Sequence, residues 1–269
     1  INDGFIKVLS TPGNVGILIF LVILGTMVCL MNKAGGSRAY GEWAVSHIKN
    51  RAGASIATFF LGVLIFVDDY FNCLTVGSVM RPVTDAQKIS RAKLAYLIDA
   101  TAAPICMIAP VSSWAAAVSS YAPDGQGIKL FCQAIPYNFY SLLTLCFVVI
   151  LVLARFDYGP MVRYERNAIE KGDVHTVVPE QVMQELDEHS PGRGKLADLV
   201  VPVLLLIALE TFALVYVGGI LEGKSFADAL SSTDATVGLP WGAVIALVLV
   251  MAFYRLRGVL SFRAAMRCI

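Results

Sequence analysis

Long apolar runs limit what this chain can fold into. Four of them, over residues 12–31, 128–154, 197–221 and 241–254 with its flanks, contain few or no charged side chains. A helix needs about 20 such residues to cross the hydrocarbon core of a bilayer. Because 57% of the 269 residues are apolar and only 15% are charged, the chain lacks the polar surface of an ordinary water-soluble protein. We therefore predict an all-α membrane protein that crosses the bilayer several times.

A fifth apolar segment is too short to cross. Residues 53–67 (GASIATFFLGVLIFV) end at the adjacent acids Asp68 and Asp69. They would extend about 22 Å as a helix, whereas the hydrocarbon core is about 30 Å thick. Residues 71–79 are again mostly apolar. We predict a re-entrant hairpin over about residues 53–80, which turns at the two aspartates and returns to the side from which it entered. Backbone that is not helical at this depth must be covered by protein or water.

The segment after the hairpin contains two helix breakers. Thr84 begins the sequence TDAQ, which has the form of a capping box and predicts a helix start. Pro104 and Pro110 follow, and each lacks the N–H group that a helix interior needs. We predict a broken membrane helix over about residues 94–119, with carbonyl oxygens released near its middle.

The basic residues favour this path, because short cytoplasmic loops collect Lys and Arg. If the hairpin returns, 18 of the 21 basic residues fall in four segments on one side, over residues 32–52, 81–93, 155–195 and 255–267. The predicted organisation is then membrane helices with the hairpin and broken helix in residues 1–154, a cytoplasmic linker in 155–196, two further membrane helices in 197–257, and the start of a following element in 258–269. We expect the chain to be part of a longer transporter.

Acids within the membrane segments are candidate functional groups, because a buried charge is costly there. The chain offers Asp68, Asp69, Asp99 and Glu210. One of the hairpin aspartates can equally serve only to cap the turn, since turns favour aspartate. Glu210 has no helix break beside it, which favours a packing or lumen-lining role.

Asp99 is the strongest candidate, because it precedes Pro104 in a segment that also contains the hydroxyls of Thr101, Ser112 and Ser113. Carboxylate, carbonyl and hydroxyl oxygens suit a hard cation such as Na⁺. A carboxylate at this depth favours its protonated form when no cation is present. The sequence therefore predicts a site at which Na⁺ and H⁺ alternate, with Na⁺ held by Asp99, Thr101 and Asp69. A hydrogen bond between helices is the alternative role of Asp99.

Enzyme functions find little support in the sequence. It contains neither an HExxH zinc motif nor a GxSxG nucleophile turn. An intramembrane aspartyl protease could use Asp69 and Asp99, although neither lies in a tyrosine-aspartate or glycine-x-glycine-aspartate setting. We predict that the protein is not an enzyme. Its six cysteines form no CxxC pair and lie mostly in apolar runs, so we read them as small buried hydrophobic residues rather than disulfides.

Residues 67–117, VDDYFNCLTVGSVMRPVTDAQKISRAKLAYLIDATAAPICMIAPVSSWAAA, resemble the signature stretch of bacterial sodium/proton antiporters of the NhaC type, within the ion transporter superfamily. The resemblance implies a multi-pass antiporter of the bacterial inner membrane, built from two inverted halves and working without a cofactor. The matching polar positions are Asp68, Asp69, Asn72, Thr75, Arg81, Thr84, Asp85, Asp99, Thr101, Ser112 and Ser113. Ala100 departs from the family pattern, which commonly has serine there.

The expected partners are membrane lipid, Na⁺ and H⁺, with no nucleic acid. Because the family resemblance extends to carriers of organic acids, coupled exchange of an acid such as malate for lactate remains an alternative function. A homodimer is also left open. We place Asp68, Asp69, Asn72, Asp99, Thr101, Ser112 and Ser113 in the predicted cation and proton site.

Overall fold

The computed structural model describes residues 4, 6–7, 10–119, 121–122, 126–176 and 194–268. Every regular element in these ranges is a helix. Among the described residues, three helices are long and apolar enough to cross a membrane, and a bent pair of helices over residues 127–154 makes a fourth if it forms one span. The three are α2 (Pro12–Lys33), α12 (Ala197–Val217) and α14 (Ala235–Leu256). The predicted all-α membrane fold is therefore confirmed. The chain divides into two compact units, which are described separately.

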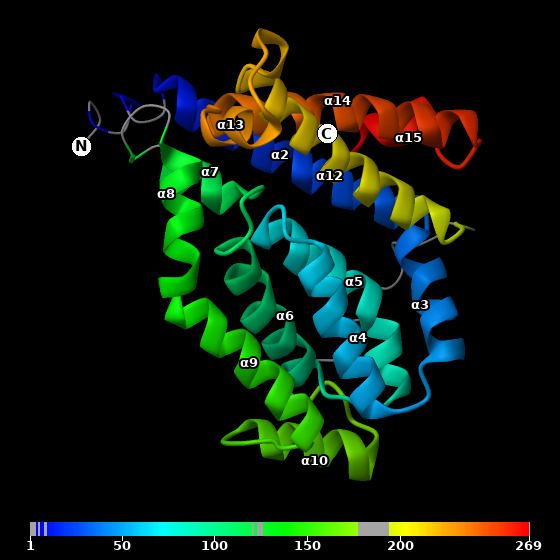
Figure 1. Ribbon diagram of the computed structural model, residues 1–269. Coiled ribbons are helices and arrows are strands. Elements are labelled where there is room, and N and C mark those ends of the chain that lie inside the picture. Colours follow the sequence, from blue (N-terminus) through cyan, green and yellow to red (C-terminus); the bar gives the residue numbers. More distant parts are fainter. Residues whose placement is uncertain are drawn as a thin grey trace. The chain divides into compact units, whose positions relative to one another are not determined.

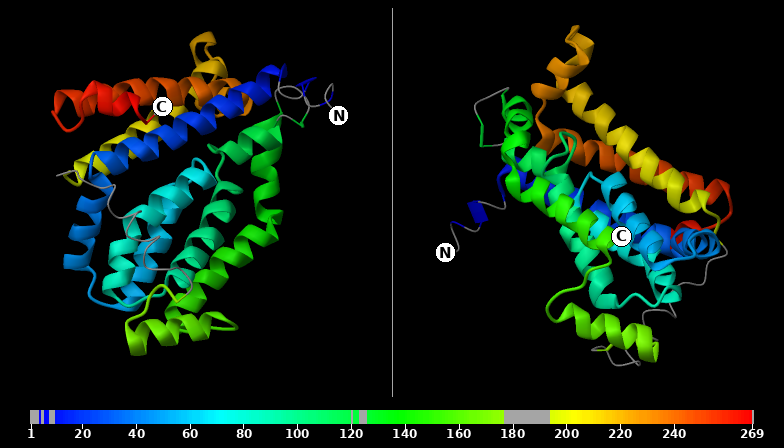
Figure 2. Two further views of the ribbon diagram at one scale, coloured as in Figure 1. Left: turned by 180° about the vertical axis from the view of Figure 1, so that it is seen from behind. Right: turned by 60° about the horizontal axis from the view of Figure 1, so that its bottom comes forward.

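Unit 1 consists of Ile1–Leu30, Cys106–Asn138 and Val201–Ile269. Besides α2, α12 and α14 it contains the short helices α7 (Ser113–Ser119), α8 (Gly127–Ala134), η1 (Ile135–Tyr137), η2 (Ile220–Glu222), α13 (Phe226–Ser231) and α15 (Phe262–Met266). The long helices α2, α12 and α14 lie side by side (Figures 1 and 2), and glycines occur where they contact each other. A Cβ atom on Gly16 would lie 2.4 Å from the carbonyl oxygen of Thr236, and one on Gly242 would lie 2.7 Å from the Cα of Glu210. Unit 1 therefore packs its long helices backbone to backbone.

One pair of cysteines corrects a sequence prediction. Cys29 of α2 and Cys268 form a disulfide, with Cα atoms 5.7 Å apart. Because the two cysteines are 239 residues apart in the sequence, no local spacing motif could predict the pair. Cys106 is buried, as predicted, whereas Cys146 of α9 is exposed.

Unit 2 consists of Met31–Ile105 and Phe139–Val200. Its helices are α3 (Gly36–His47), α4 (Arg51–Leu64), α5 (Asp69–Ala86), α6 (Arg91–Cys106), α9 (Phe139–Ala154) and α10 (Met161–Lys171). Leu97 and Ala100 of α6 pack on Val148, Leu151 and Val152 of α9, and Ile56 and Phe59 of α4 join this core. Helix α5 packs against both α3 and α4. Figure 2 shows α10 at one end of this unit.

The structure gives the helix boundaries within the predicted segments. The run at residues 128–154 forms two helices, because Pro136 lies in a 3-10 turn that separates α8 from α9, and the pair, bent by 52°, together has the length and apolar composition of one broken span or re-entrant loop. Helix α14 begins at Ala235, since Asp234 caps it and Pro240 is accommodated within it. The predicted linker at 155–196 contains α10, and its residues 177–193 lie outside the described part of the chain.

The predicted hairpin corresponds to α4 and α5, which lie side by side in Figure 1. The side chain of Asn50 caps the start of α4 by accepting a hydrogen bond from the N–H of Gly53. The chain does turn back, because Gln87 Nε2, just beyond α5, donates to the carbonyl of Ile48, just before α4, at 3.1 Å. The two ends of the hairpin therefore meet.

The end of the hairpin differs from the prediction. Helix α5 continues through Pro82 to Ala86 instead of stopping near residue 80. The hydroxyl of Thr84 donates to the carbonyls of Met80 and Arg81, so Thr84 lies inside this helix and does not begin a new one. The actual cap of α6 is Ser90, whose hydroxyl accepts from the N–H of Lys93 at 3.1 Å.

Candidate functional site

The turn between α4 and α5 is centred on Asp68. Its carboxylate accepts a hydrogen bond from the N–H of Phe71 at 2.8 Å and so caps α5. The side chain is buried, at 1% exposure, within a segment that carries almost no other charge. Asp69 is the first residue of the helix and is half-buried. Negative charge at a helix N-terminus is favourable, which helps to hold both acids at this turn.

Asn72 closes the turn one helical turn later. Its Nδ2 donates to the carbonyls of Gly62 and Ile65, at 2.6 and 2.7 Å. These two oxygens belong to the C-terminal end of α4, where helical carbonyls lack a partner within the helix. Asn72 is fully buried, and its own Oδ1 has no hydrogen-bond partner in the described residues. Leaving a buried acceptor unpaired costs about 1–3 kcal/mol, so such an atom requires an explanation.

A second unpaired oxygen lies on the same face of α5. The hydroxyl of Thr75 is buried and, within the described ranges, also has no hydrogen-bond partner. Asp68, Asn72 and Thr75 are spaced i, i+4 and i+7, which places them in one row along the helix. This row, which we call the hairpin stripe, is the most polar buried surface of the hairpin.

Thr101 of α6 completes this buried cluster. A Cβ atom added to Gly62 would lie 3.0 Å from the Cγ2 of Thr101 and 3.7 Å from the Oδ1 of Asn72. Only glycine therefore fits easily where α4, α5 and α6 meet. The hydroxyl of Thr101 donates to the carbonyl of Leu97 at 2.7 Å, which leaves its oxygen able to accept or to coordinate.

Asp99 lies elsewhere on α6. It is exposed, whereas Thr101 is buried, because residues two apart on a helix do not share a face. Asp69, Asp99 and Asp68 nevertheless all act electrostatically on the thiol of Cys73, the residue after Asn72. The three predicted acids differ in exposure, with Asp68 buried, Asp69 half-buried and Asp99 exposed.

At the second predicted break, between α6 and α7, the hydroxyl of Ser112 has hydrogen-bond partners, unlike the unpaired oxygens of Asn72 and Thr75 at the first. Pro104 lies within α6, and the chain leaves the helix after Cys106. The hydroxyl of Ser112 donates to the carbonyl of Cys106 at 2.7 Å and accepts from the N–H of Ala115 at 3.1 Å. Ser112 therefore caps α7, and Ser113 is the first residue of that helix. Both serines belong to unit 1, whereas Asp99 and Thr101 belong to unit 2.

Comparison with known proteins places the sequence in a family. The sequence model described as "Na+/H+ antiporter family" matches residues 115–259, more than half of the chain. The chain belongs to the Na⁺/H⁺ antiporter family. It is also 34% identical over 241 residues to an uncharacterized protein of Haemophilus influenzae, an alignment that covers 84% of this chain. The chain spans 44% of that relative's length. No solved structure matches it.

The matched region begins at residue 115, so it shares only three residues with the 67–117 stretch that resembles the NhaC type. The hairpin stripe lies outside the match. Its assignment as a site therefore depends on its own geometry.

Two features of the cluster were missed from sequence. Thr75 was noted only as part of the resemblance, although its i+7 spacing from Asp68 was visible. The roles of Gly62 and of the carbonyl of Ile65 had no local signal, because they arise from the packing of α4 against α5 and α6.

The opposite end of the hairpin is fixed by ion pairs that the sequence did not predict. Glu165 of α10 is 2% exposed and forms a salt bridge with Arg51 at the start of α4. Its other oxygen accepts from the N–H of Ser90 at 2.7 Å. Lys93 of α6 lies 3.6 Å from Glu165 and 2.5 Å from Asp157. These contacts anchor the starts of α4 and α6 to α10.

Proposed function

We propose that the protein exchanges Na⁺ for H⁺ across the bacterial inner membrane by alternating access. Membership in the Na⁺/H⁺ antiporter family supports the two ions as substrates. The observation that carries the location of the site is the pair of buried, unpaired oxygens, Asn72 Oδ1 and Thr75 Oγ1, on the same helix face as Asp68.

In this proposal Na⁺ is bound by oxygens of the hairpin stripe. A hard cation prefers carboxylate, amide and hydroxyl oxygens, which are the three groups that Asp68, Asn72 and Thr75 present. The amide nitrogen of Asn72 is held by Gly62 and Ile65, so its oxygen is directed away from them. Thr101 contributes an additional oxygen from α6. The cation then relieves the cost of the unpaired acceptors.

The proton is carried by the neighbouring carboxylates. Asp99 and Asp69 are more accessible than Asp68 and act on the same residue, Cys73, so they can exchange protons with water while remaining near the stripe. Binding of Na⁺ favours the ionised carboxylates, and loss of Na⁺ favours protonation. One set of oxygens then serves both ions in turn. Ser112 and Ser113 are left to the start of α7.

The hairpin is proposed to enter and leave the membrane from the cytoplasmic side. Its short first helix, the hydrogen bond between its two ends and the basic residues beside them support this path. The second half of an inverted repeat would supply a corresponding hairpin. Labelling of Lys88→Cys, an exposed position after α5, is expected only from the cytoplasmic side. Labelling from the outside would show that the hairpin crosses the membrane.

The transport activity is tested with the full-length protein in sealed vesicles. An inward Na⁺ gradient should drive a change of internal pH with no organic acid present. A strict requirement for malate or lactate would instead establish coupled exchange of organic acids. A Na⁺ current that does not respond to a pH gradient would indicate a channel. Cleavage of a membrane-embedded peptide that disappears in Asp69→Asn would indicate an aspartyl protease.

A further inference from the structure

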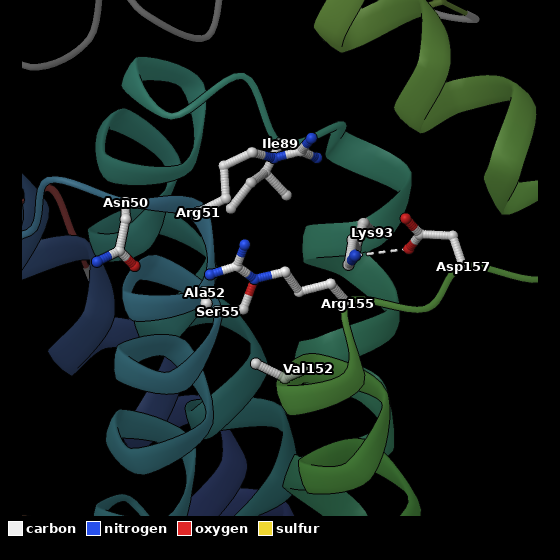
Figure 3. A pocket seen from close by; sticks show the side chains of 9 residues that line it. All are labelled: Asn50, Arg51, Ala52, Ser55, Ile89, Lys93, Val152, Arg155 and Asp157. Atoms are coloured by element: carbon white, nitrogen blue, oxygen red, sulfur yellow. Dashed lines mark hydrogen bonds and ion pairs between the residues drawn. The ribbon is translucent and has the colours of Figure 1, made fainter.

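A separate cavity lies at the end of unit 2 opposite the turn at Asp68. Its volume is about 320 Å³, and its polar lining is formed by Asn50, Arg51, Ser55, Lys93, Arg155 and Asp157. Ala52, Ile89 and Val152 provide an apolar part of the wall. Figure 3 shows that these side chains come from the beginnings of α4 and α6 and from the end of α9. Three helix ends therefore surround one polar space.

The charges around this cavity do not balance. Arg51 is paired with Glu165, and Lys93 is paired with Asp157 and Glu165. Arg155 forms no ion pair with any of the described residues. Three cations face two acids, so the local excess is one positive charge. An anion that enters the cavity would meet the Arg155 guanidinium without displacing an existing pair.

The backbone directs Arg155 into this space. Its φ of 52° is in the left-handed region, where glycine is the usual residue after a helix. The N–H of Arg155 donates to the carbonyl of Val152 at 3.3 Å, which ends α9. Figure 3 shows the side chain extending from the end of α9 toward the first turns of α4. An unfavourable backbone conformation is thus retained at a position where the side chain supplies the unpaired charge.

The surroundings of Arg155 resemble a membrane interface. Ile150 and Leu153, in the last turns of α9, are 61% and 63% exposed. The aromatic rings of Phe156 and Tyr158 follow directly and stack on each other. Amphipathic aromatic side chains concentrate at the level of lipid headgroups, and the apolar helix surface next to them suits acyl chains.

We propose that this cavity binds the phosphate of an anionic phospholipid, with Arg155 as the principal ligand. The guanidinium can hold two phosphate oxygens with parallel hydrogen bonds. The N-terminus of α4, at Arg51, adds a favourable dipole for an anion. The acyl chains would lie along the exposed apolar surface of α9. Free inorganic phosphate offers the same chemistry without the chains, so the two sources must be distinguished.

Lipid binding here does not depend on the proposed transport, because none of the cavity residues belongs to the hairpin stripe. The best variant is Arg155→Gly, which removes the cation and suits the backbone conformation at this position. Arg155→Gln removes the charge while keeping a long side chain. Arg163→Gln is the matched control, since Arg163 is an exposed arginine of α10 that does not line the cavity.

The experiment measures the melting temperature of the purified full-length protein in neutral detergent. Phosphatidylglycerol, phosphatidylcholine or inorganic phosphate is then added. We expect phosphatidylglycerol to raise the melting temperature of the wild type and of Arg163→Gln by several degrees, because a ligand that binds only the folded state stabilises it. Arg155→Gly and Arg155→Gln should lose most of this increase, and Arg155→Gly should melt no earlier than wild type in detergent alone.

Each outcome bears on the proposal. An increase with phosphatidylglycerol but not with inorganic phosphate identifies a lipid site. An equal increase with inorganic phosphate supports a phosphate site that is not restricted to lipid. Equal responses to phosphatidylglycerol and phosphatidylcholine, or an unchanged response in both Arg155 variants, would overturn it.

Discussion

The chain contains two helix breaks that look alike in sequence and differ in structure. In the first, between α4 and α5, Asn72 pairs the carbonyls of Gly62 and Ile65 but leaves its own oxygen buried and unpaired. In the second, between α6 and α7, Ser112 both donates and accepts. The first break therefore has acceptor capacity that a cation can use, whereas the second satisfies the groups it exposes.

We infer from this difference that the first break can bind a cation, whereas the second only shapes the chain. Both contain an acid or hydroxyl next to irregular backbone, and both lie in apolar surroundings. The useful criterion is whether buried oxygens remain without a donor once the local hydrogen bonds have formed. The predictions below use this criterion, and each variant is made in the full-length protein.

Asn72→Ala should have the largest effect. It removes the proposed cation ligand and leaves the carbonyls of Gly62 and Ile65 without their donor, at a cost of roughly 2–6 kcal/mol for the two groups. Na⁺-driven pH change in vesicles should be abolished, and the melting temperature should fall. Asn138→Ala is the matched control, because Asn138 makes a longer bond of 3.3 Å to the carbonyl of Met107 near the second break. Equal losses in the two variants would remove the distinction between the breaks.

Asp99→Asn should abolish exchange with little change in stability. The side chain keeps its size but loses its titratable charge, and its exposure means that few contacts are lost. Asp99→Glu should retain exchange, because it keeps a carboxylate that can carry the proton. Glu170→Gln, at an exposed acid of α10, provides the control for loss of one surface charge. A wild-type rate and pH profile in Asp99→Asn would confine the coupling acids to Asp68 and Asp69.

Gly62→Ala should weaken Na⁺ binding moderately. The new methyl group would lie 3.0 Å from the Cγ2 of Thr101, and overpacking of this kind costs about 1–3 kcal/mol. The Na⁺ concentration for half-maximal exchange should rise several-fold. Gly77→Ala is the control, since its methyl group would lie 3.6 Å from Ile98, an ordinary contact. If both variants exchange equally well, the cluster is looser than proposed.

Ser112→Ala should have the smallest effect on transport. It removes the cap of α7, which costs about 0.5–2 kcal/mol of stability. The melting temperature should decrease, while the Na⁺ affinity of the folded protein stays unchanged. Ser112→Thr keeps the hydroxyl and should restore the stability. A large increase in the Na⁺ concentration that Ser112→Ala needs for half-maximal exchange would instead show that Ser112 is a ligand of the cation.

Sequence patterns identified the parts of the fold that depend on local composition. The long helices follow from their apolar runs, and the turn at Asp68 follows from a short run that ends in acids. The capping box at Thr84 predicted a helix start that is not there. The Thr84 hydroxyl donates to the carbonyls of Met80 and Arg81 in the preceding turn, and α5 continues past Pro82. A local motif does not show whether a hydroxyl will accept from a following N–H as a cap or donate to a carbonyl of the preceding turn.

The candidate site was only partly accessible to the same reasoning. Asn72 was among the predicted residues, but its two hydrogen bonds to the carbonyls of Gly62 and Ile65 form only in the packed hairpin. Asp99 and Thr101 were grouped because they are close in sequence, whereas the helix places one in an exposed and the other in a buried position. Sequence proximity therefore does not show which residues of one helix share a face.

The ion pairs of Glu165 also set an order of events during synthesis. Glu165 follows its partner Arg51 by 114 residues and Ser90 by 75. At a translation rate of about 5–20 residues per second, Arg51 waits roughly 6–23 s for its partner. During that interval the starts of α4 and α6 carry uncompensated cations, which remain in water more readily than in lipid. The hairpin can therefore insert into the membrane before α10 is synthesised. Its ends are fixed only when Glu165 of α10 forms its ion pair with Arg51.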